Sequence, residues 1–336
     1  MNKIKEQTSF LFKFLHWPLI ARILILIFII NSIFGAIIHT IEPEEFPNWF
    51  DGFWWTIVTT ATLGYGDFVP VTVLGRSIAI ILILVGTGFV STYFVTLAAS
   101  AIATQNNYLE GKVDYRGSEH IIVIGWNERV RETLRQINSM SSKPLSMVLI
   151  DQSLQKNPLH DQNVHFIKGN PSYDQTLLAA NIKQAAFVVI SADQSKNEVQ
   201  ADMNSVLTLL TVKGLNSEVY TIVEILTSQQ VKNAWRAGAD EVVQTNMFTS
   251  YVMINSMMSN GMSETLLNML DQLKGSKLKF LDVDHSLIGE TFEKVSNILL
   301  QEKTLLIGIK RRGDTMVNPP LLTLIQKDDC LLVIRD

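Results

Sequence analysis

The 336-residue sequence holds one cysteine, Cys330, so no disulfide can form within the chain. Basic residues are not in excess either. Lys and Arg number 28 against 32 Asp and Glu, a net charge of −4 that argues against a nucleic-acid partner. No Arg-rich segment stands before the first long apolar run, which argues against a voltage-sensing helix. Charge is missing altogether from residues 77–109. The chain therefore combines a strongly apolar part with an ordinary soluble part.

Two apolar runs are long enough to cross a bilayer. Residues 20–38 are nearly all Ile, Leu and Phe, and as a helix they would extend about 28 Å, close to the hydrocarbon thickness. Residues 77–109 form the second run. Between them lies a shorter apolar segment, Phe53–Thr62, which is too short to span and is predicted to be a half-spanning helix. The sequence thus predicts a membrane protein with two crossings.

A glycine-containing motif follows the short segment: Thr62, Leu63, Gly64, Tyr65, Gly66 and Asp67. Its order and surroundings resemble the pore of potassium channels, with an outer helix, a pore helix, a selectivity filter and an inner helix. The resemblance implies that K⁺ is bound by oxygens of Thr62, Leu63, Gly64 and Tyr65. Gly64 and Gly66 permit the backbone that such a filter requires. The family usually has Val where Leu63 stands, and Asp67 would close the outer end.

Two glycines near the middle of the second run, Gly86 and Gly88, are candidate gating residues. In related channels a glycine at the spacing of Gly86 from the filter is the hinge on which the inner helices splay. The alternative is that these small residues only permit close helix packing.

Charges flanking the apolar runs predict how the chain is oriented in the membrane. Lys3, Lys5 and Lys13 precede the first run, and Lys and Arg follow the second, whereas the loop between the first run and the short segment is acidic. The positive-inside rule then places both termini in the cytoplasm of a multi-pass cell-membrane protein. The acidic loop either concentrates cations at the pore mouth or is simply solvated. Its carboxylates are Glu42, Glu44, Glu45 and Asp51.

Beyond residue 117 the pattern changes to apolar strands that alternate with helices. The predicted strands are 120–126, 145–151, 164–169, 185–191, 219–224 and 241–244. Continuous apolar strands with helical connections favour a parallel sheet covered on both faces, a Rossmann-like α/β domain. Three further strands, 278–283, 305–311 and 330–334, with a hairpin at Gly313 and Asp314, predict a small α+β subdomain.

A two-helix pore followed by such a domain resembles prokaryotic potassium channels with an RCK (regulator of K⁺ conductance) domain, including calcium-gated archaeal channels. Residues 122–128 are similar to the family's first strand and turn, and 237–243 to its sixth-strand entry. The resemblance implies a pore domain (1–109), a linker (110–117), an RCK Rossmann-like domain (118–261) and an RCK C-terminal subdomain (262–336).

The regulatory ligand is left open between two recognisable classes and a ligand that the sequence does not identify. For NAD or an adenine nucleotide, Gly125 keeps the first glycine of the dinucleotide fingerprint and Asp151 ends the second strand, but the other glycines are missing. For a divalent cation such as Ca²⁺, the resemblance carries one family glutamate onto Glu224. The other falls on Leu226, and the family aspartate falls on Ser191, with Asp193 nearby.

Three functions compete. The favoured one is a ligand-gated potassium channel that is not an enzyme. The others are a regulatory RCK subunit of a potassium transporter and a nucleotide-dependent enzyme. Two crossings cannot enclose a pore, so the filter implies a homotetramer whose RCK domains form a gating ring. A ring of eight would need additional soluble RCK copies from an internal start.

Overall fold

The computed structural model describes residues 17–140, 145–160, 162–271 and 277–335. The lysines of the N-terminal tail, on which part of the orientation depends, lie outside the described residues. The chain divides into two compact units, Met1–Asn107 and Tyr108–Asp336, each described below by itself.

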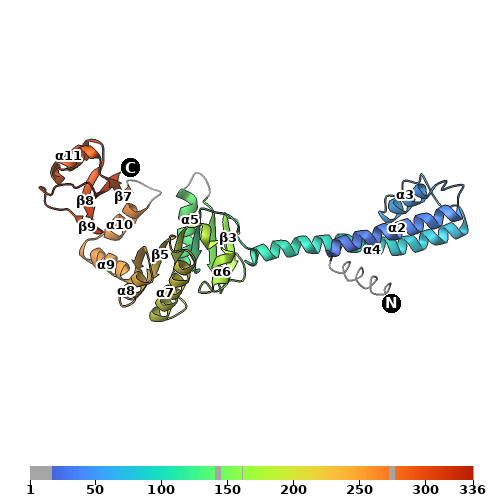
Figure 1. The fold of residues 1–336 in the computed structure, drawn as a ribbon, viewed down its shortest axis with the longest axis horizontal. Helices are drawn as coiled ribbons and strands as arrows, with labels where there is room; N and C mark the ends of the chain where they lie inside the picture. Colours follow the sequence, from blue (N-terminus) through green and yellow to red (C-terminus); the bar gives the residue numbers. More distant parts are fainter. Residues whose placement is uncertain (1–16, 141–144, 161, 272–276, 336) are drawn as a thin grey trace, which may run out of the picture. The chain divides into compact units, whose positions relative to one another are not determined.

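Within residues 17–107, the described part of the first unit, three helices are present (Figure 1). They are α2 (Leu19–Ile41), α3 (Trp49–Thr60) and the first 35 residues of α4 (Val73–Leu109). α2 and α4 have the length and apolar composition of membrane spans, and 23 residues extend α2 to about 34 Å. The predicted outer and inner helices are present, each starting earlier than the apolar run alone suggests. The short helix begins at Trp49 because the side chain of Asn48 accepts a hydrogen bond from the amide of Asp51.

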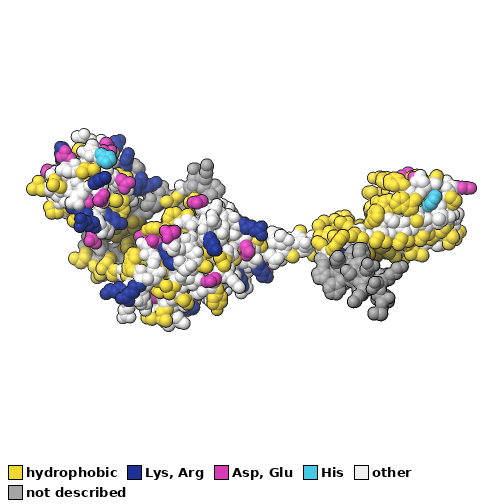
Figure 2. Space-filling view, in the orientation of Figure 1, with side chains coloured by type: hydrophobic (Ala, Val, Ile, Leu, Met, Phe, Trp, Pro, Cys, Tyr) yellow, Lys and Arg dark blue, Asp and Glu magenta, His cyan; other side chains and the backbone are white. Residues whose placement is uncertain are grey.

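Hydrophobic side chains cover most of the visible face of this unit (yellow, Figure 2). The few buried ones form a small cluster of Ile38, Phe46, Trp55 and Leu82. α2 and α3 approach closely through glycines, since a Cβ atom at Gly35 would lie 2.7 Å from the Cα of Phe53. Exposed apolar surface around a small core fits helices whose solvent is lipid.

A six-stranded parallel sheet in the order β3-β2-β1-β4-β5-β6 begins the second unit. Its strands are β1 (His120–Ile124), β2 (Met147–Asp151), β3 (Val164–Lys168), β4 (Ala185–Ile190), β5 (Tyr220–Ile225) and β6 (Glu241–Gln244). This is the Rossmann strand order. All six strands lie within about two residues of the predicted ranges.

Helices cover both faces of this sheet. α5 (Glu128–Met140) packs Val130 and Leu134 on one face with Val123 and Leu149. The opposite face carries Ile122, Val148 and Ile150 and is covered by α6 (Asp174–Ala179), η1 (Ile182–Gln184), α7 (Glu198–Leu215) and α8 (Val231–Arg236). Neighbouring residues of one strand therefore point into different layers, as a three-layer α/β/α domain requires.

The rest of the unit holds two helices and a small α+β part. α9 (Thr245–Met258) and α10 (Met262–Leu270) come first. An antiparallel sheet follows in the order β7-β10-β8-β9. Its elements are β7 (Lys277–Asp282), η2 (His285–Leu287), α11 (Phe292–Gln301), β8 (Leu305–Arg311), β9 (Asp314–Val317) and β10 (Cys330–Arg335). Gly313, at φ +95°, forms the predicted hairpin turn between β8 and β9.

Candidate functional site

The loop after α3 has an alternating backbone. Thr62, Gly64 and Gly66 have φ of +60°, +57° and +78°, whereas the residues between them do not have positive φ. Such alternation turns successive peptide groups to one side, as in the nests of backbone amides that bind anions. A filter needs its carbonyls turned to one side in the same way. Thr62 holds a conformation unusual for a residue with a side chain, a form of strain that collects at functional sites.

The outer end of this loop is held by Trp54 of α3. Its indole donates a 2.8 Å hydrogen bond to Asp67 Oδ2, and its ring stacks on Tyr65 with centroids 6.2 Å apart. At the inner end the amides of Leu63 and Thr62 donate to carbonyls of α3. Trp55 points elsewhere and packs on Phe46.

Behind the loop, buried polar groups join α2 to α3. Asn31 is 2% exposed in α2, and its Oδ1 accepts a hydrogen bond from the Thr60 hydroxyl at 3.2 Å. The Thr56 hydroxyl donates to the Asn31 carbonyl at 3.1 Å. The sequence offered a signal for this contact, because Asn31 is a polar residue in the middle of an apolar run.

The two candidate gating glycines of α4 have different surroundings. Gly86 is buried, and a Cβ atom there would lie 2.2 Å from Thr60 Cγ2. At Gly88 a Cβ atom would meet nothing within 4 Å. Gly86 thus makes the close contact that the packing alternative requires.

Glu42, expected as one of the acidic loop residues, is buried rather than solvated. At 4% exposure it accepts hydrogen bonds from the amides of Val71 and Thr72 at 2.9 and 3.0 Å and from the Thr72 hydroxyl. Burial acts to raise the pKa of Glu42, but these hydrogen bonds and the charge of Arg76 together bring it below its usual value. Its carboxylate lies just before the first residue of α4, where a helix favours negative charge.

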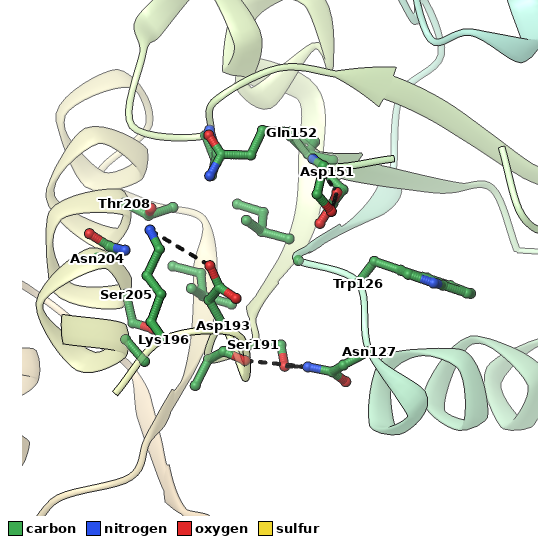
Figure 3. Close-up of a pocket in the computed structure, with 18 of the residues that line it drawn as sticks. Trp126, Asn127, Asp151, Gln152, Ser191, Asp193, Lys196, Asn204, Ser205 and Thr208 are labelled. Atoms are coloured by element: carbon green, nitrogen blue, oxygen red, sulfur yellow. Dashed lines mark hydrogen bonds and ion pairs between the residues drawn. The ribbon is translucent and has the colours of Figure 1, made fainter. Parts of the chain in front are cut away.

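The second unit carries a cleft of about 680 Å³ at the carboxyl ends of β1, β2 and β4. The sheet order reverses at this place, which is where Rossmann folds bind ligands. Gly125, Asp151 and Asp193, three of the predicted ligand-binding residues, line it. In Figure 3, Asp151 and Gln152 lie across the cleft from Asn204 and Thr208, and Trp126 points away from it.

Each predicted cleft residue has defined partners. Gly125 has φ +92°, and a Cβ atom there would lie 3.2 Å from the Ser191 carbonyl oxygen. Asp151 accepts three hydrogen bonds through Oδ1, from the Ser153 amide and hydroxyl and the Leu154 amide. Asp193 accepts from the amide and hydroxyl of Ser195 and pairs with Lys196 at 3.6 Å. Burial acts to raise the pKa of Asp193, but its bonds to Ser195 and Lys196 hold it below its usual value.

Glu224, the fourth predicted ligand residue, does not line the cleft. Its Oε2 accepts from the Ser191 hydroxyl and the Ala192 amide at 2.8 and 2.9 Å, and its Oε1 accepts from the Thr245 hydroxyl at 2.6 Å. Arg129 pairs with the same carboxylate at 2.7 Å. Among the described residues no three His, Cys, Asp or Glu side chains are grouped as a metal site.

Other polar residues of the cleft were missed from the sequence. Asn127 stands where the fingerprint has its second glycine; its Oδ1 accepts from the Val130 amide at 3.0 Å, and its Nδ2 donates to Ser191. This side chain caps α5 at the place where a dinucleotide's pyrophosphate usually binds. Lys196 is the one Lys or Arg among the described residues that line the cleft, and Ser205 and Thr208 of α7 complete its polar wall.

Comparison with known proteins finds matches to both parts of the chain. The ion channel family model matches residues 23–103, and the TrkA-N domain model matches residues 121–245. YugO of Bacillus subtilis, named as a candidate potassium channel protein, is 44% identical over 328 residues, which cover 95% of this chain and 97% of YugO. The chain therefore belongs to the family of potassium channel proteins that join an ion-channel pore to a TrkA-N (RCK) domain.

One further relative and one solved structure are similar over most of this chain. The calcium-gated potassium channel TvoK of Thermoplasma volcanium is 28% identical over 294 residues, 85% of this chain and 83% of TvoK. The solved structure of the GsuK channel has a TM-score of 0.50 at 18% identity; the match covers 94% of this chain and 57% of the GsuK chain. At 18% identity, the similarity to GsuK shows a shared fold only.

Proposed function

We propose that four copies of this chain form a potassium-selective pore in the cell membrane. The observation that carries the proposal is the alternating backbone of Thr62, Gly64 and Gly66, held at its outer end by Trp54 and Asp67. Oxygens of Thr62, Leu63, Gly64 and Tyr65 replace the water around K⁺. Two spans in each chain cannot enclose a pore, so the subunits share one.

Reversal potentials test this function. Purified channel in a planar bilayer with KCl on one side and an equal concentration of NaCl on the other should give a large reversal potential, negative on the KCl side, because K⁺ crosses far more readily than Na⁺. Equal permeability to the two cations would contradict the proposal. Light scattering of the detergent-solubilised protein should give the mass of four chains; a much larger particle that also contains a shorter chain would indicate extra RCK copies.

We infer that both termini face the cytoplasm, so that the cleft samples cytoplasmic ligands. The acidic loop that holds Glu44 and Glu45 would then face outward, as the positive-inside rule expects. A cysteine placed at Glu45 in a Cys330→Ser background should react with a membrane-impermeant thiol reagent added to intact cells. Reaction only after the cells are opened would reverse the assignment.

For the regulatory ligand we propose a nucleotide of the NAD or adenine class. The cleft lies where Rossmann folds bind nucleotides, and Asp151 ends β2 as a ribose-binding carboxylate would. Its three hydrogen bonds all involve Oδ1, which leaves Oδ2 for the ligand. Because Asn127 caps α5, the phosphates would lie toward Lys196 instead of on the amides of that helix.

Calcium is the second candidate, because the relative TvoK is named as calcium-gated. A cation at Glu224 would have to displace Arg129, 2.7 Å from its carboxylate. Isothermal titration of the whole channel with NAD⁺ and, separately, with Ca²⁺ compares the two. If Asp151→Asn weakens NAD⁺ binding while Glu224→Gln leaves it unchanged, the nucleotide is supported. Loss of a Ca²⁺ response on Glu224→Gln or Asp193→Asn would select the cation.

A further inference from the structure

The cleft of the second unit is lined by more carboxylates than cations. Its wall holds Glu128, Asp151 and Asp193, whereas Lys196 is the one Lys or Arg among the described residues that line it. A ligand with several phosphates would therefore face three carboxylates and a single ammonium group. Like charges repel more strongly in a partly enclosed site than in open water, so this wall disfavours a ligand with many negative charges.

The ammonium group of Lys196 is already shared with Asp193. The two side chains pair at 3.6 Å, as Figure 3 shows, and the Lys196 amide donates to the Asp193 carbonyl at 3.3 Å. Asp193 is held in place in turn, because it accepts hydrogen bonds from the Ser195 amide and hydroxyl at 3.0 and 2.6 Å. A phosphate bound by Lys196 thus has a fixed carboxylate as its neighbour.

The helices that begin beside the cleft use some of their own N-terminal amides. Asn127 accepts from the Val130 amide of α5 at 3.0 Å, and Asn197 accepts from the Gln200 amide of α7 at 2.9 Å. Each asparagine therefore occupies an amide that an anion at a helix N-terminus would otherwise use. Beyond Lys196, a chain of phosphates finds few donors here.

The remaining polar groups of the cleft suit hydroxyl and amide groups of a ligand. Ser205 and Thr208 of α7 are each 3% exposed and line the cleft beside Asn204. Asp151 is 8% exposed and accepts its three hydrogen bonds through Oδ1, so Oδ2 remains for a ribose hydroxyl. The same carboxylate repels a phosphate. The wall therefore fits a nucleoside better than it fits a polyphosphate.

We propose that the cleft selects its nucleotide by phosphate charge, binding AMP and NAD⁺ and rejecting ADP and ATP. The first phosphate meets the ammonium group of Lys196. Each further phosphate adds about one negative charge and finds no second cation among the described lining residues. In NAD⁺ the positive nicotinamide ring offsets one of the two phosphates. The proposal rests on the proposed nucleotide-binding function and names the class of nucleotide that this cleft takes.

Isothermal titration of the whole channel with AMP, ADP, ATP and NAD⁺ tests the selection, with adenosine as the reference. All titrations share one ionic strength and contain EDTA, so that no Mg²⁺ neutralises the phosphates. We expect ADP to bind more weakly than AMP, and ATP at least about tenfold more weakly than AMP. ATP binding as tight as AMP binding would overturn the selection and leave the nucleotide assignment intact. If none of the five compounds binds, the nucleotide assignment fails and the selection fails with it.

Asp193→Asn tests the cause, and Asp284→Asn is its matched control. Both aspartates accept hydrogen bonds from the amide and hydroxyl of the serine two positions on, Ser195 or Ser286, but Asp284 lies in the small α+β part. Loss of the charge at position 193 should reduce the ratio of the ATP and AMP dissociation constants by at least about threefold. Adenosine affinity should stay the same, and Asp284→Asn should keep the wild-type ratio. A wild-type ratio in folded Asp193→Asn would overturn the proposal.

Lys196→Gln tests the place of the first phosphate. AMP should lose its advantage over adenosine, whereas adenosine should bind as it does to the wild type. An unchanged advantage of AMP would show that Lys196 does not hold the phosphate. If Asp193→Asn does not fold, Glu128→Gln removes another lining carboxylate, one whose side chain pairs only at the surface with Arg131, and carries the same expected reduction and the same contrary outcome.

Discussion

The hydroxyl of Thr60 in the pore helix donates a 3.2 Å hydrogen bond to the side-chain oxygen of Asn31 in the outer helix. Thr60 also donates to the Thr56 carbonyl within its own helix. Its methyl carbon lies against Gly86 of α4, 2.2 Å from where a Cβ atom would stand. A single residue behind the Thr62–Asp67 loop therefore contacts both α2 and α4.

Replacing Asn31 by Leu should lower the thermal stability of the assembled channel. Interhelical hydrogen bonds in membranes average about 0.6 kcal/mol, so the loss is modest in each subunit and adds over the subunits. Gel filtration after heating gives the midpoint of subunit dissociation. Thr40→Val, on the same helix with a hydroxyl bonded only to its own helix, should leave the midpoint in place. An unchanged midpoint for Asn31→Leu would show that the bond contributes nothing.

Gly86→Ala should bias the gate toward its closed state while selectivity is kept. A double variant separates the hinge from the packing explanation. Thr60→Ser removes the methyl carbon that a Cβ atom at position 86 would meet at 2.2 Å. Recovery of open probability in the Gly86→Ala, Thr60→Ser channel would assign the effect to packing; no recovery would favour the hinge. Gly88→Ala, where the Cβ atom meets nothing within 4 Å, is the control.

Gly64→Ala and Gly66→Ala should each abolish K⁺ conduction without preventing membrane insertion. Neither Cβ atom would meet another atom within 4 Å, so in the described chain the cost comes from the positive φ alone. That cost is about 1 to 2 kcal/mol for each residue, and it is repeated in every subunit. Potassium flux into liposomes measures conduction, and carbonate extraction measures insertion. Wild-type flux in either variant would mean that this loop does not line the pore.

Glu42→Gln should weaken the start of α4. The amide side chain has one oxygen where the carboxylate accepts bonds from both the Val71 and Thr72 amides, and it has no charge. The pKa of Glu42 is lowered in the folded protein, so its contribution is present above the usual value of 4.5 and is lost as pH falls through the lowered value. The difference in melting temperature between wild type and Glu42→Gln should therefore shrink in acid. Glu44→Gln is the control, and a constant difference down to pH 3 would contradict this role.

His120 should make the second unit sensitive to mild acid. It is fully buried, its Nε2 lies 2.9 Å from the Ala180 carbonyl oxygen, and its Nδ1 has no partner among the described atoms. Burial lowers the pKa of His120 below 6.5, although the bond to Ala180 opposes the shift. The unfolded chain then binds the proton first, so stability is full above pH 6.5 and falls below it, by up to about 1.4 kcal/mol for each pH unit.

Melting curves of the whole channel between pH 5 and pH 8 measure this effect. His120→Gln should flatten the dependence on pH below 6.5. His285→Gln, at an exposed position, shows how much of the slope another histidine contributes. A slope as steep in His120→Gln as in the wild type would rule out His120 as its source.

Periodicity and turn chemistry were enough to predict the strands and the two long apolar helices, whereas the role of the Thr62–Asp67 loop was expected from its resemblance to a channel filter. The apolar runs of β1 and β2 and the Thr62–Asp67 motif are local signals, and so is the hairpin at Gly313. The partners of charged groups are not local. Glu224 and Arg129 are 95 positions apart in the sequence, and only the folded sheet shows that the arginine already pairs with the expected cation ligand.

Glu42 is a similar case. Its membership of an acidic loop suggested that it either draws cations to the pore mouth or is simply solvated. Its hydrogen-bond partners Val71 and Thr72 instead lie about 30 residues further along the sequence, beyond the Thr62–Asp67 loop. The linker carried too few apolar residues to predict a docked segment. Its attachment depends on backbone groups of Gly111 and Lys168, which leave little trace in composition.

Residues 110–117, which follow α4, bond to the edge strand β3, and this has a consequence for assembly. β3 is an edge strand of the six-stranded sheet, and open edges invite pairing with a strand of another molecule. Lys168 and His165 already bond to Gly111 and Val113, so this edge is covered by the subunit's own chain. A strand of a neighbouring subunit could pair with β3 only after the bonds from Lys168 and His165 to residues 111 and 113 were broken. Association that continued the sheet across β3 would therefore disconnect the domain from the helix that it is meant to move.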